Sequence, residues 1–546
     1  MIALCIAALG SALGLLGCRV DENDVHRWEG TVQGPKKLCA VLLHDKYETS
    51  LRVESALAII RMKPRSGRRL AFTQIDSDVE AENPTCKGSL VDVLSALEPE
   101  AQKAIVGPLV SSIIVELKKP PPVYKEGEPI PTDGSIPYKD AAYALLMADK
   151  PVLISDEAQK KDLKIALTEW AMADFEHRLE ARGQASSMDQ VLRAVGSEAV
   201  AGLPKLMVRD ARKLGEMSIL VADIGDEKAK EAASAALVEA AQWVLGEDWA
   251  KVRTKELEKQ NADQKLTPTP EQFKKQLETL QDDELMKLFQ ALRRVGGRPA
   301  VDFALGFAAR KDQSDKRRQT ALAALDATGK PGKPKSLDKS NPDDVKRLVE
   351  IAGSDAPDVV LDQAFRRLGE MPREVVADKL YGLFKTDKWK VRRAAAATLL
   401  KLSNVKHIGE FLKALPDGKP FAMGEALTYG ALLGELKEGK PLDELKPFMN
   451  SGTPAARTSA IAYYFTYGTS AELPDLAPLL VDGEWGPAPA PSCDTDPECK
   501  WICEVPKEGE QGREQKEIKT ISDFVRYCIQ PAMKERKPEA GKEQKK

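Results

Sequence analysis

The sequence predicts an all-α protein in which helical hairpins stack side by side to form a solenoid. Three observations lead to this fold class. Apolar residues recur at helical spacing in pairs of short segments, of which Leu380–Leu402 is the clearest. The same pattern returns along the chain at a nearly constant separation. Aromatic residues make up only 5% of the chain, so small aliphatic side chains dominate the packing, as in closely stacked helices.

The segment Leu380–Leu402 shows the repeating unit. Leu380 and Phe384 lie on the apolar face of a first helix. A short polar stretch follows, in which Asp387 is placed to cap a second helix. The second helix has its own apolar face, formed by Val391, Ala395 and Leu399. One hairpin cannot bury both of its faces, so each hairpin needs a neighbour on either side.

Copies of the second helix recur at a regular interval. Four of them are anchored at Val360, Val391, Gly424 and Ala456, at separations of 31, 33 and 32 residues. This spacing is typical of helical-hairpin solenoids. Looser copies begin near Leu51, Ala229 and Arg317.

The repeat resembles the HEAT family, whose second helix carries Asp-Pro-x-Val-Arg followed by small residues. The match is best in Lys388–Leu402, although Asp387 lies four residues before Val391 instead of three. The resemblance is clear over about residues 350–470 and scattered before them. It implies an α-solenoid that serves as a binding surface without chemistry of its own. It also implies a ladder of Asp and Arg side chains between repeats, of which several copies here lack one member.

The N-terminal segment Met1–Gly17 is uncharged and almost wholly apolar, and Cys18 follows it directly. This resembles a bacterial lipoprotein signal peptide, which implies lipidation of Cys18. The alternative is an uncleaved membrane anchor, but a spanning helix needs about 20 residues. Arg19, not Asp, follows the cysteine, so the sorting rule of such lipoproteins implies the outer membrane, facing the periplasm or the cell surface.

Six cysteines remain after Cys5 of the signal and Cys18 are set aside. An even number in an exported protein predicts disulfides that staple the two ends of the solenoid. Zinc is the alternative at the C-terminal four, but their spacing lacks paired knuckles. We predict that a helix carries Cys499 and Cys503 and runs antiparallel to Ile521–Ile529. The predicted pairs are Cys39–Cys86, Cys499–Cys528 and Cys493–Cys503.

The chain is expected to divide into several parts. A proline-rich stretch at 118–137 is either a mobile insertion, which we favour, or a binding strap. The predicted parts are a signal peptide at 1–17, a lipid-anchored tether at 18–24, degenerate helical repeats at 25–257, a linker at 258–270, a solenoid at 271–482 with a polar loop at 327–342, a cysteine-rich helical module at 483–533, and a disordered charged tail at 534–546.

Sequence patterns for catalysis are missing. The four histidines have no metal-like spacing, and neither a phosphate-binding loop nor a nucleophile elbow is present. The formal net charge of -3 provides no general field for nucleic acid. Consecutive Arg392 and Arg393 could bind an anionic partner, but a ladder between repeats plus a solvated face is the commoner role. We therefore expect no enzyme, no cofactor and no metal.

These observations predict a non-enzymatic, lipid-anchored protein-interaction scaffold of the bacterial cell envelope. Its partners would be another envelope protein and, through the lipid, the membrane, but not nucleic acid. Two alternatives stay open. The first is a HEAT-like lyase or small-molecule chaperone, because fold alone does not determine function. The second is a purely structural envelope spacer.

Overall fold

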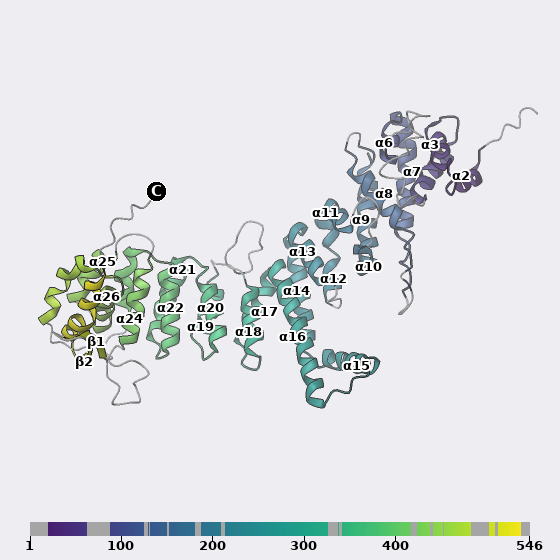
Figure 1. Cartoon of the computed structure of the whole chain (residues 1–546). Helices are drawn as coiled ribbons and strands as arrows, with labels where there is room; N and C mark the ends of the chain where they lie inside the picture. The colour runs from purple at the N-terminus through teal and green to yellow at the C-terminus, as the bar shows by residue number, and fades with distance from the viewer. Residues whose placement is uncertain are drawn as a thin grey trace, which may run out of the picture. The chain divides into compact units, whose positions relative to one another are not determined.

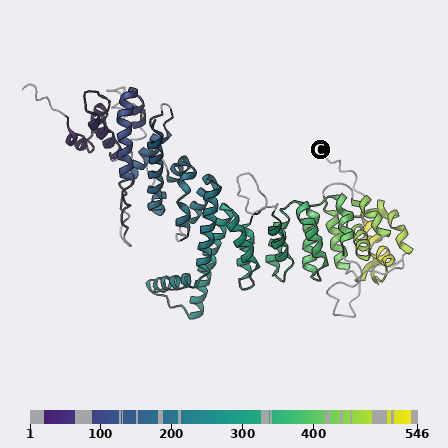
Figure 2. The ribbon, with the colours of Figure 1, turned by 180° about the vertical axis from the view of Figure 1, so that it is seen from behind.

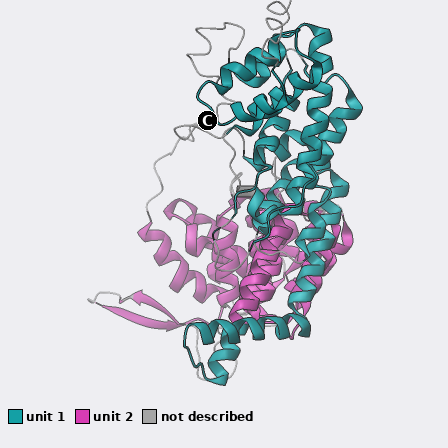
Figure 3. Cartoon of the chain, turned by 90° about the vertical axis from the view of Figure 1, so that its right-hand side faces the viewer, with its two compact units in different colours: residues 1–277 teal, residues 278–546 magenta. Residues whose placement is uncertain are grey.

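The structure is a computed structural model of the 546-residue chain. It describes residues 20–62, 88–124, 129, 131–149, 152–180, 187–208, 213–325, 337, 341–415, 423–436, 441–450, 453–481, 502–507 and 512–536. The chain forms two compact units, residues 1–277 and 278–546, drawn in teal and magenta in Figure 3. Both are predominantly helical, so the predicted all-α solenoid is confirmed. Among the residues described, no helix has the length and apolarity that a membrane span requires.

Unit 1 is built from helices alone within its described residues, apart from one isolated β-bridge. Neighbouring helices in the chain pack on each other, as α3 does on α4 and α7 on α8. The elements are α2 (Glu22–Trp28), α3 (Gly34–Leu43), α4 (Thr49–Arg61), α6 (Leu90–Ser95), α7 (Pro99–Leu117), α8 (Ile136–Met147), α9 (Glu157–Ala173), α10 (Phe175–Glu180), α11 (Met188–Val195), η1 (Ser197–Val200), α12 (Leu203–Met207), α13 (Leu214–Ile224), α14 (Glu227–Val244), α15 (Glu247–Asp263) and the start of α16 (Pro270–Val295).

Unit 2 contains the regular repeats. Its second helices α18, α20, α22, α24 and α26 lie side by side in sequence order, as both views of the ribbon show (Figures 1 and 2). Its elements are α17 (Arg298–Ala309), α18 (Asp315–Ala324), α19 (Pro342–Ala352), α20 (Asp358–Leu368), α21 (Arg373–Gly382), η2 (Leu383–Lys385), α22 (Trp389–Lys401), η3 (Val405–His407), α23 (Ile408–Ala414), α24 (Met423–Gly434), α25 (Pro441–Asn450), α26 (Pro454–Tyr467), η4 (Ser470–Val481), β1 (Ile502–Pro506), β2 (Arg513–Glu517), α27 (Ile521–Asp523), η6 (Phe524–Ile529) and α28 (Gln530–Glu535).

The apolar face predicted for the second helix is buried in the structure. Val391 is 1% exposed, and Ala395 and Leu399 are fully buried. Their counterparts Val360 and Ala364 in α20 are fully buried too. The small side chains let successive helices approach closely, so the core is one continuous strip between stacked hairpins.

Three arginines of the repeat close their own hairpins, whereas Asp–Arg pairs between repeats are formed at other positions, as by Asp302 of α17 and Arg347 of α19. Each of the three donates a hydrogen bond from Nε to a backbone carbonyl near the end of the preceding helix, where carbonyls lack helical partners. The donor–acceptor distance is 2.8 Å in all three cases, which are Arg52 to Leu42, Arg318 to Ala308 and Arg457 to Met449.

Asp387 does not cap α22, contrary to the sequence prediction. Lys388 occupies the N-cap position and makes no side-chain cap bond. The extra residue between Asp387 and Val391 moves the carboxylate out of the capping position. Other second helices do have caps, such as the Asp226 carboxylate, which accepts from the Ala229 amide at 2.7 Å.

Helices α24 and α26 approach until their backbones touch. A methyl group at Gly430 would lie 2.7 Å from the backbone of Ala462. One at Gly434 would lie 1.9 Å from the Tyr467 ring. The Tyr467 hydroxyl donates to the Ala431 carbonyl at 3.0 Å and holds the ring across α24. Only glycine fits both positions.

The end of the proline-rich stretch 118–137 is fixed to α9 and α10. Arg178 Nε donates to the Asp133 carboxylate at 2.9 Å, and Trp170 Nε1 donates to Ser135 Oγ at 2.6 Å. All four residues are at least nine-tenths buried. A buried, hydrogen-bonded charge pair is costly to separate.

The beginning of the same stretch is held as well. The Tyr124 ring stacks on His177 at a centroid distance of 3.8 Å. Burial and a hydrogen bond to Asp174 raise the pKa of the Tyr124 hydroxyl to about 12. These contacts hold the two described ends of the stretch against α9 and α10, and the choice between an insertion and a binding strap stays a prediction.

The C-terminal module contains a β-hairpin as well as helices. Strands β1 and β2 are antiparallel, and Cys503 lies opposite Lys516. Cys503 is bonded to Cys528 of η6, with their Cα atoms 5.5 Å apart. The predicted pairs Cys499–Cys528 and Cys493–Cys503 are therefore wrong. The prediction placed Cys503 on a helix with Cys499, whereas Cys503 lies on a strand.

This module covers the last hairpin of the stack. Arg536 donates to the Phe465 carbonyl of α26 at 2.6 Å, and Ser522 donates to the Leu480 carbonyl at 2.6 Å. The bonds satisfy carbonyls that a further repeat would otherwise cover. At the other predicted boundary, 258–270, helix α15 continues to Asp263, so half of the expected linker is helical.

Candidate functional site

A groove of about 610 Å³ lies between α20 and α22 of unit 2. We call it the α20–α22 groove. Equivalent positions of two successive repeats face each other across it, as Asp358 and Lys390 do at a separation of 32 residues. Its lining is Asp358, Leu361, Asp362, Phe365, Arg366, Gly369, Lys390, Arg393, Ala394, Ala397, Thr398 and Lys401.

The floor of the α20–α22 groove is apolar. Leu361 and Phe365 come from α20 and are 7% and 4% exposed. Ala394 and Ala397 face them from α22. The lining positions of each helix recur every three or four residues, so they form one face of each helix. Alanines on one side leave room above the larger side chains on the other.

The rim of the α20–α22 groove carries unpaired positive charge. The Lys390 ammonium is neutralised by Asp358, at 2.8 Å from the nearer carboxylate oxygen. Arg366, Arg393 and Lys401 are exposed and have no hydrogen-bond or ion partner among the described residues. Asp362 is the one acidic lining residue in the same situation, so the groove has a local positive excess in a chain whose net charge is -3.

A second cavity of about 720 Å³ continues the groove between α22 and α24. The two cavities share Ala397 and Lys401. The remaining residues that line the second cavity are Leu400, Leu402, Ser403, Asn404, Leu432, Glu435 and Leu436. Helix α24 is in direct contact with α26 at Gly430 and Gly434.

Two roles were considered for Arg392 and Arg393, contacts between repeats and binding of an anionic partner, and the two arginines differ in which one they can take. Arg392 points into the stack, donates to the Thr386 carbonyl at 2.7 Å and forms an ion pair with Glu425 of α24. Arg393 is exposed and lines the groove. The structural role therefore belongs to the first arginine, and the second is free for a ligand.

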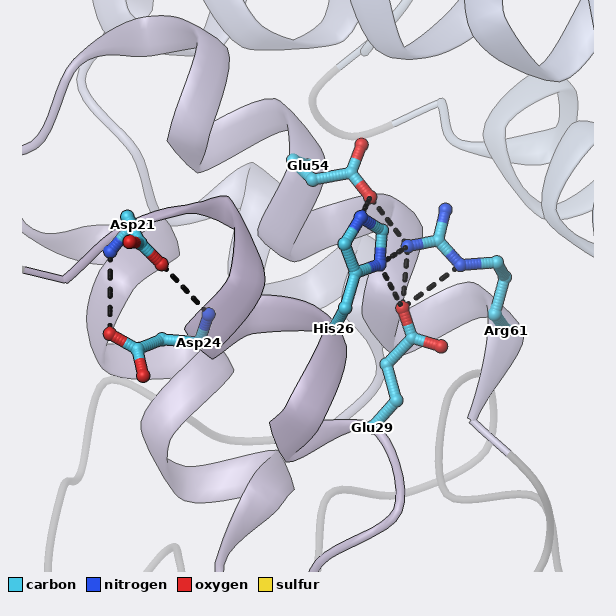
Figure 4. A network of polar contacts seen from close by, with 6 residues as sticks. All are labelled: Asp21, Asp24, His26, Glu29, Glu54 and Arg61. Carbon is cyan, nitrogen blue, oxygen red and sulfur yellow. Dashed lines mark hydrogen bonds and ion pairs between the residues drawn. The ribbon is translucent and has the colours of Figure 1, made fainter.

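Unit 1 has a cleft of about 1070 Å³ under the proline-rich stretch. Arg61 lies at its wall and forms ion pairs with Glu29 and Glu54, both at 2.5 Å, as Figure 4 shows. Burial opposes the charged form of Arg61, but hydrogen bonds to both carboxylates outweigh this effect and raise its pKa. His26 Nδ1 lies 3.3 Å from Glu29, and the residues Asp21 and Asp24 in the same view form the N-cap of α2.

The other titratable groups of this cleft are also paired or neutral. Burial raises the pKa of the Tyr138 hydroxyl, and Lys119 donates to Glu116 at 2.7 Å. The Ser135 hydroxyl donates to the Asp133 carboxylate, but both groups are also bonded to Trp170 and Arg178 and belong to the contacts that hold the proline-rich stretch. The cleft can therefore hold a ligand by shape and hydrogen bonds, but its described groups offer no evident reaction.

One group of side chains in unit 1 has the composition of a metal site. Ligand atoms of Glu22, His26 and Glu54 lie within 4.8 Å of one another. The Arg61 guanidinium already pairs with Glu54 and places a positive charge beside the group. This charge disfavours a cation there.

The structure locates only part of the cysteine set. Cys39 is fully buried in α3 and is disulfide-bonded, and its partner is a cysteine outside the described residues. The pairing of Cys39 with Cys86 therefore stays a prediction. Cys86 lies outside the described residues, as do Cys5, Cys18, Cys493 and Cys499.

Sequence reasoning missed Arg366 and Lys401 of the groove and Arg61 of the cleft. A signal for the first two was present. Positions 32 residues apart in neighbouring repeats face each other, so Gly369 and Lys401 could have been paired by counting. Arg61 had no such signal, because Glu29 reaches it from a different helix.

No protein-family profile and no curated protein matches the chain. Among solved structures, it is similar to that of the Pds5–Scc1 complex, at 12% identity and a TM-score of 0.31, over 75% of this chain and 67% of that one. It is similar to Kap121p bound to Pho4p at 16% identity and a TM-score of 0.24, over 83% of this chain and 40% of that one. For importin beta the values are 13%, 0.19, 82% and 59%. The chain thus spans less than two thirds of Kap121p and of importin beta. Its fold is assigned from its own helices.

Proposed function

We propose that the chain is a non-enzymatic protein-interaction scaffold, anchored by lipid in the bacterial cell envelope. The observation that carries this proposal is the α20–α22 groove, an open and uncompensated surface on the stacked second helices. Arg366, Arg393 and Lys401 line this groove together with the apolar residues Leu361 and Phe365, and the structure gives the three cations no acidic partner among the described residues. A surface of this kind favours a macromolecular partner.

The proposed location in the cell envelope is inferred from the amino-acid sequence. The apolar segment Met1–Gly17 ends at Cys18, which supports export and lipidation. The disulfides at Cys39 and between Cys503 and Cys528 are in keeping with an oxidising compartment. We place the protein at the outer membrane, with the solenoid facing the periplasm or the cell surface.

Site-specific photo-crosslinking in living cells tests the scaffold role. A photoreactive residue replaces Ala394, a partly exposed residue that lines the groove, in a tagged full-length chain. We expect a crosslink to one envelope protein, which also co-purifies after mild solubilisation of the membranes. The matched control has the photoreactive residue at Lys413, an exposed position on α23. Equal crosslinking at both positions, or no partner at all, would favour a structural spacer.

A small-molecule chaperone is the second candidate, and the unit 1 cleft favours it. Its volume suits a bound organic molecule, and the proline-rich stretch closes one side of it. Native mass spectrometry of the protein purified from its own membranes checks this possibility. A reproducible small-molecule adduct that is lost in a Tyr138→Ala variant would support it. A measured mass that equals the polypeptide plus its lipid would exclude the small-molecule chaperone.

A further inference from the structure

We propose that the α20–α22 groove binds an acidic segment of the partner protein, with apolar side chains of that segment seated between the two helices. This inference rests on the proposed scaffold function and names the chemistry of its partner. Arg366, Arg393 and Lys401 provide the attraction. Guanidinium groups suit carboxylates, because their fork of donors matches both carboxylate oxygens.

The apolar floor favours a peptide over other anions. A nucleic acid backbone or a lipid headgroup would pair with the cations of the rim but has no apolar side chains to contact the alanines, Leu361 and Phe365 of the floor. Asp358 and Asp362 on the same wall also repel a continuous run of phosphates. A segment that combines acidic and apolar residues meets both the cations and the floor.

The adjoining cavity gives the segment a direction. Beyond Lys401 the lining becomes leucine-rich, with Leu400, Leu432 and Leu436, and its charged member is Glu435. The bound segment would therefore place its acidic residues against α20 and α22. Its part next to α24 would be apolar and free of negative charge. The close contact of α24 with α26 sets the end of this path.

Fluorescence anisotropy with the full-length protein, purified in detergent, tests the inference. The probes are a labelled peptide of alternating glutamate and leucine and its lysine–leucine counterpart. The variant is Arg366→Glu with Arg393→Glu, and the matched control is Lys379→Glu with Lys413→Glu on the exposed sides of α21 and α23. Both variants change the net charge equally, and circular dichroism confirms that both are folded.

We expect the wild type and the control to bind the acidic peptide with similar affinity and the groove variant to bind at least about tenfold more weakly, a difference of about 1.4 kcal/mol. Added salt should weaken binding because the rim is exposed. Equal affinity of all three proteins, or preference for the lysine peptide, overturns the inference. So does competition by an oligothymidine or by phosphatidylglycerol vesicles that depends on the same arginines.

The chain's own segment 482–501 is acidic and is the competing occupant. If the peptide binds only after Asp494→Asn, Asp496→Asn and Glu498→Gln are introduced, that segment fills the groove and the partner is not needed. Failure of the inference and failure of the scaffold role give different results. A partner that co-purifies equally with the groove variant retains the scaffold and overturns the acidic segment. Groove-dependent binding of the peptide without any cellular partner retains the preference of the groove for an acidic segment and overturns the scaffold role.

Discussion

Arg318 donates a hydrogen bond from Nε to the backbone carbonyl of Ala308 at 2.8 Å, and so joins the start of α18 to the end of α17. Arg318 is only 6% exposed. Replacing it with methionine keeps much of the volume but leaves the carbonyl without its charged donor. We expect Arg318→Met to destabilise this hairpin by about 2 kcal/mol. Hydrogen exchange of the amides in α17 and α18 measures this locally, because a repeat array need not unfold as one unit.

Arg310→Met is the control for this prediction. Arg310 pairs with Asp312 at the surface, where its side chain is 47% exposed. An exposed ion pair contributes about 0–1 kcal/mol. Similar losses of protection in the two variants would show that the carbonyl bond of Arg318 does not stabilise the hairpin.

Ala395→Asp should destabilise unit 2 by more than about 3 kcal/mol. Ala395 is fully buried between stacked helices, and a carboxylate there finds no compensating partner. The same substitution at Ala235, an exposed alanine in α14, should change stability by less than about 1 kcal/mol. Thermal melting followed by circular dichroism compares the two. Lys→Ala changes after Lys534 should leave the melting temperature unchanged.

The carboxylate of Asp302 should make unit 2 sensitive to acid. Hydrogen bonds from Arg298, and then from Arg347 of α19, lower its pKa against the opposing effect of burial. A carboxyl group with a lowered pKa in the folded state stabilises the protein above its unfolded pKa of about 4. This contribution is lost as pH falls through the folded value.

The variant Asp302→Asn tests the pH dependence. It should melt at a lower temperature than the wild type at pH 7, and the difference should shrink as the pH falls below about 4. A difference in melting temperature that is constant from neutral to acidic pH would show that the ion pairs with Arg298 and Arg347 contribute little.

Non-reducing peptide mapping should recover a peptide that links Cys503 to Cys528. These residues are 25 positions apart, and the link constrains a module with little core of its own. Cys503→Ser should destabilise the module by about 2–4 kcal/mol. The double variant with Cys528→Ser should be no less stable than the single one. A linked peptide from Cys499 and Cys528 would contradict the structure.

Cys18 should carry lipid and retain the protein in the membrane fraction. Cys18→Ser should leave the segment Met1–Gly17 uncleaved, or should shift the protein out of the membrane fraction. Mass spectrometry of the N-terminal peptide and membrane fractionation measure both effects. A wild-type protein that is soluble and has the mass of the unmodified chain would contradict this prediction.

The repeats could be predicted because they depend on local regularities. Helical spacing of apolar residues and a period near 32 identify α20, α22 and α26, and burial of Val391, Ala395 and Leu399 follows from the same spacing. The C-terminal pairing could not be predicted in this way. Cys503 lies on a strand whose partner Arg513–Glu517 is highly charged, so its sequence has no alternation of apolar residues. Tertiary context decides such short strands.

The sequence allowed only part of the α20–α22 groove to be predicted. Arg393 was noticed as part of a basic pair, but which of the two arginines faces inward depends on Thr386 and Glu425, which come from the preceding turn and the next repeat. The contacts at the end of the proline-rich stretch had no signal in the sequence for a related reason. Asp133 and Ser135 are held by Arg178 and Trp170, which come from later helices.

The arginine-to-carbonyl bonds have a consequence for how the chain acquires its structure. Arg318 and Ala308 are ten residues apart, and Arg457 and Met449 are eight apart, so each bond can form as soon as one hairpin is available. Contacts this close in sequence favour rapid folding. A chain that emerges gradually, from a ribosome or a secretion channel, can therefore close each hairpin before the next one arrives. Ordering would proceed from the N-terminal end, and the hairpin module that carries Cys503 would be the last part to join.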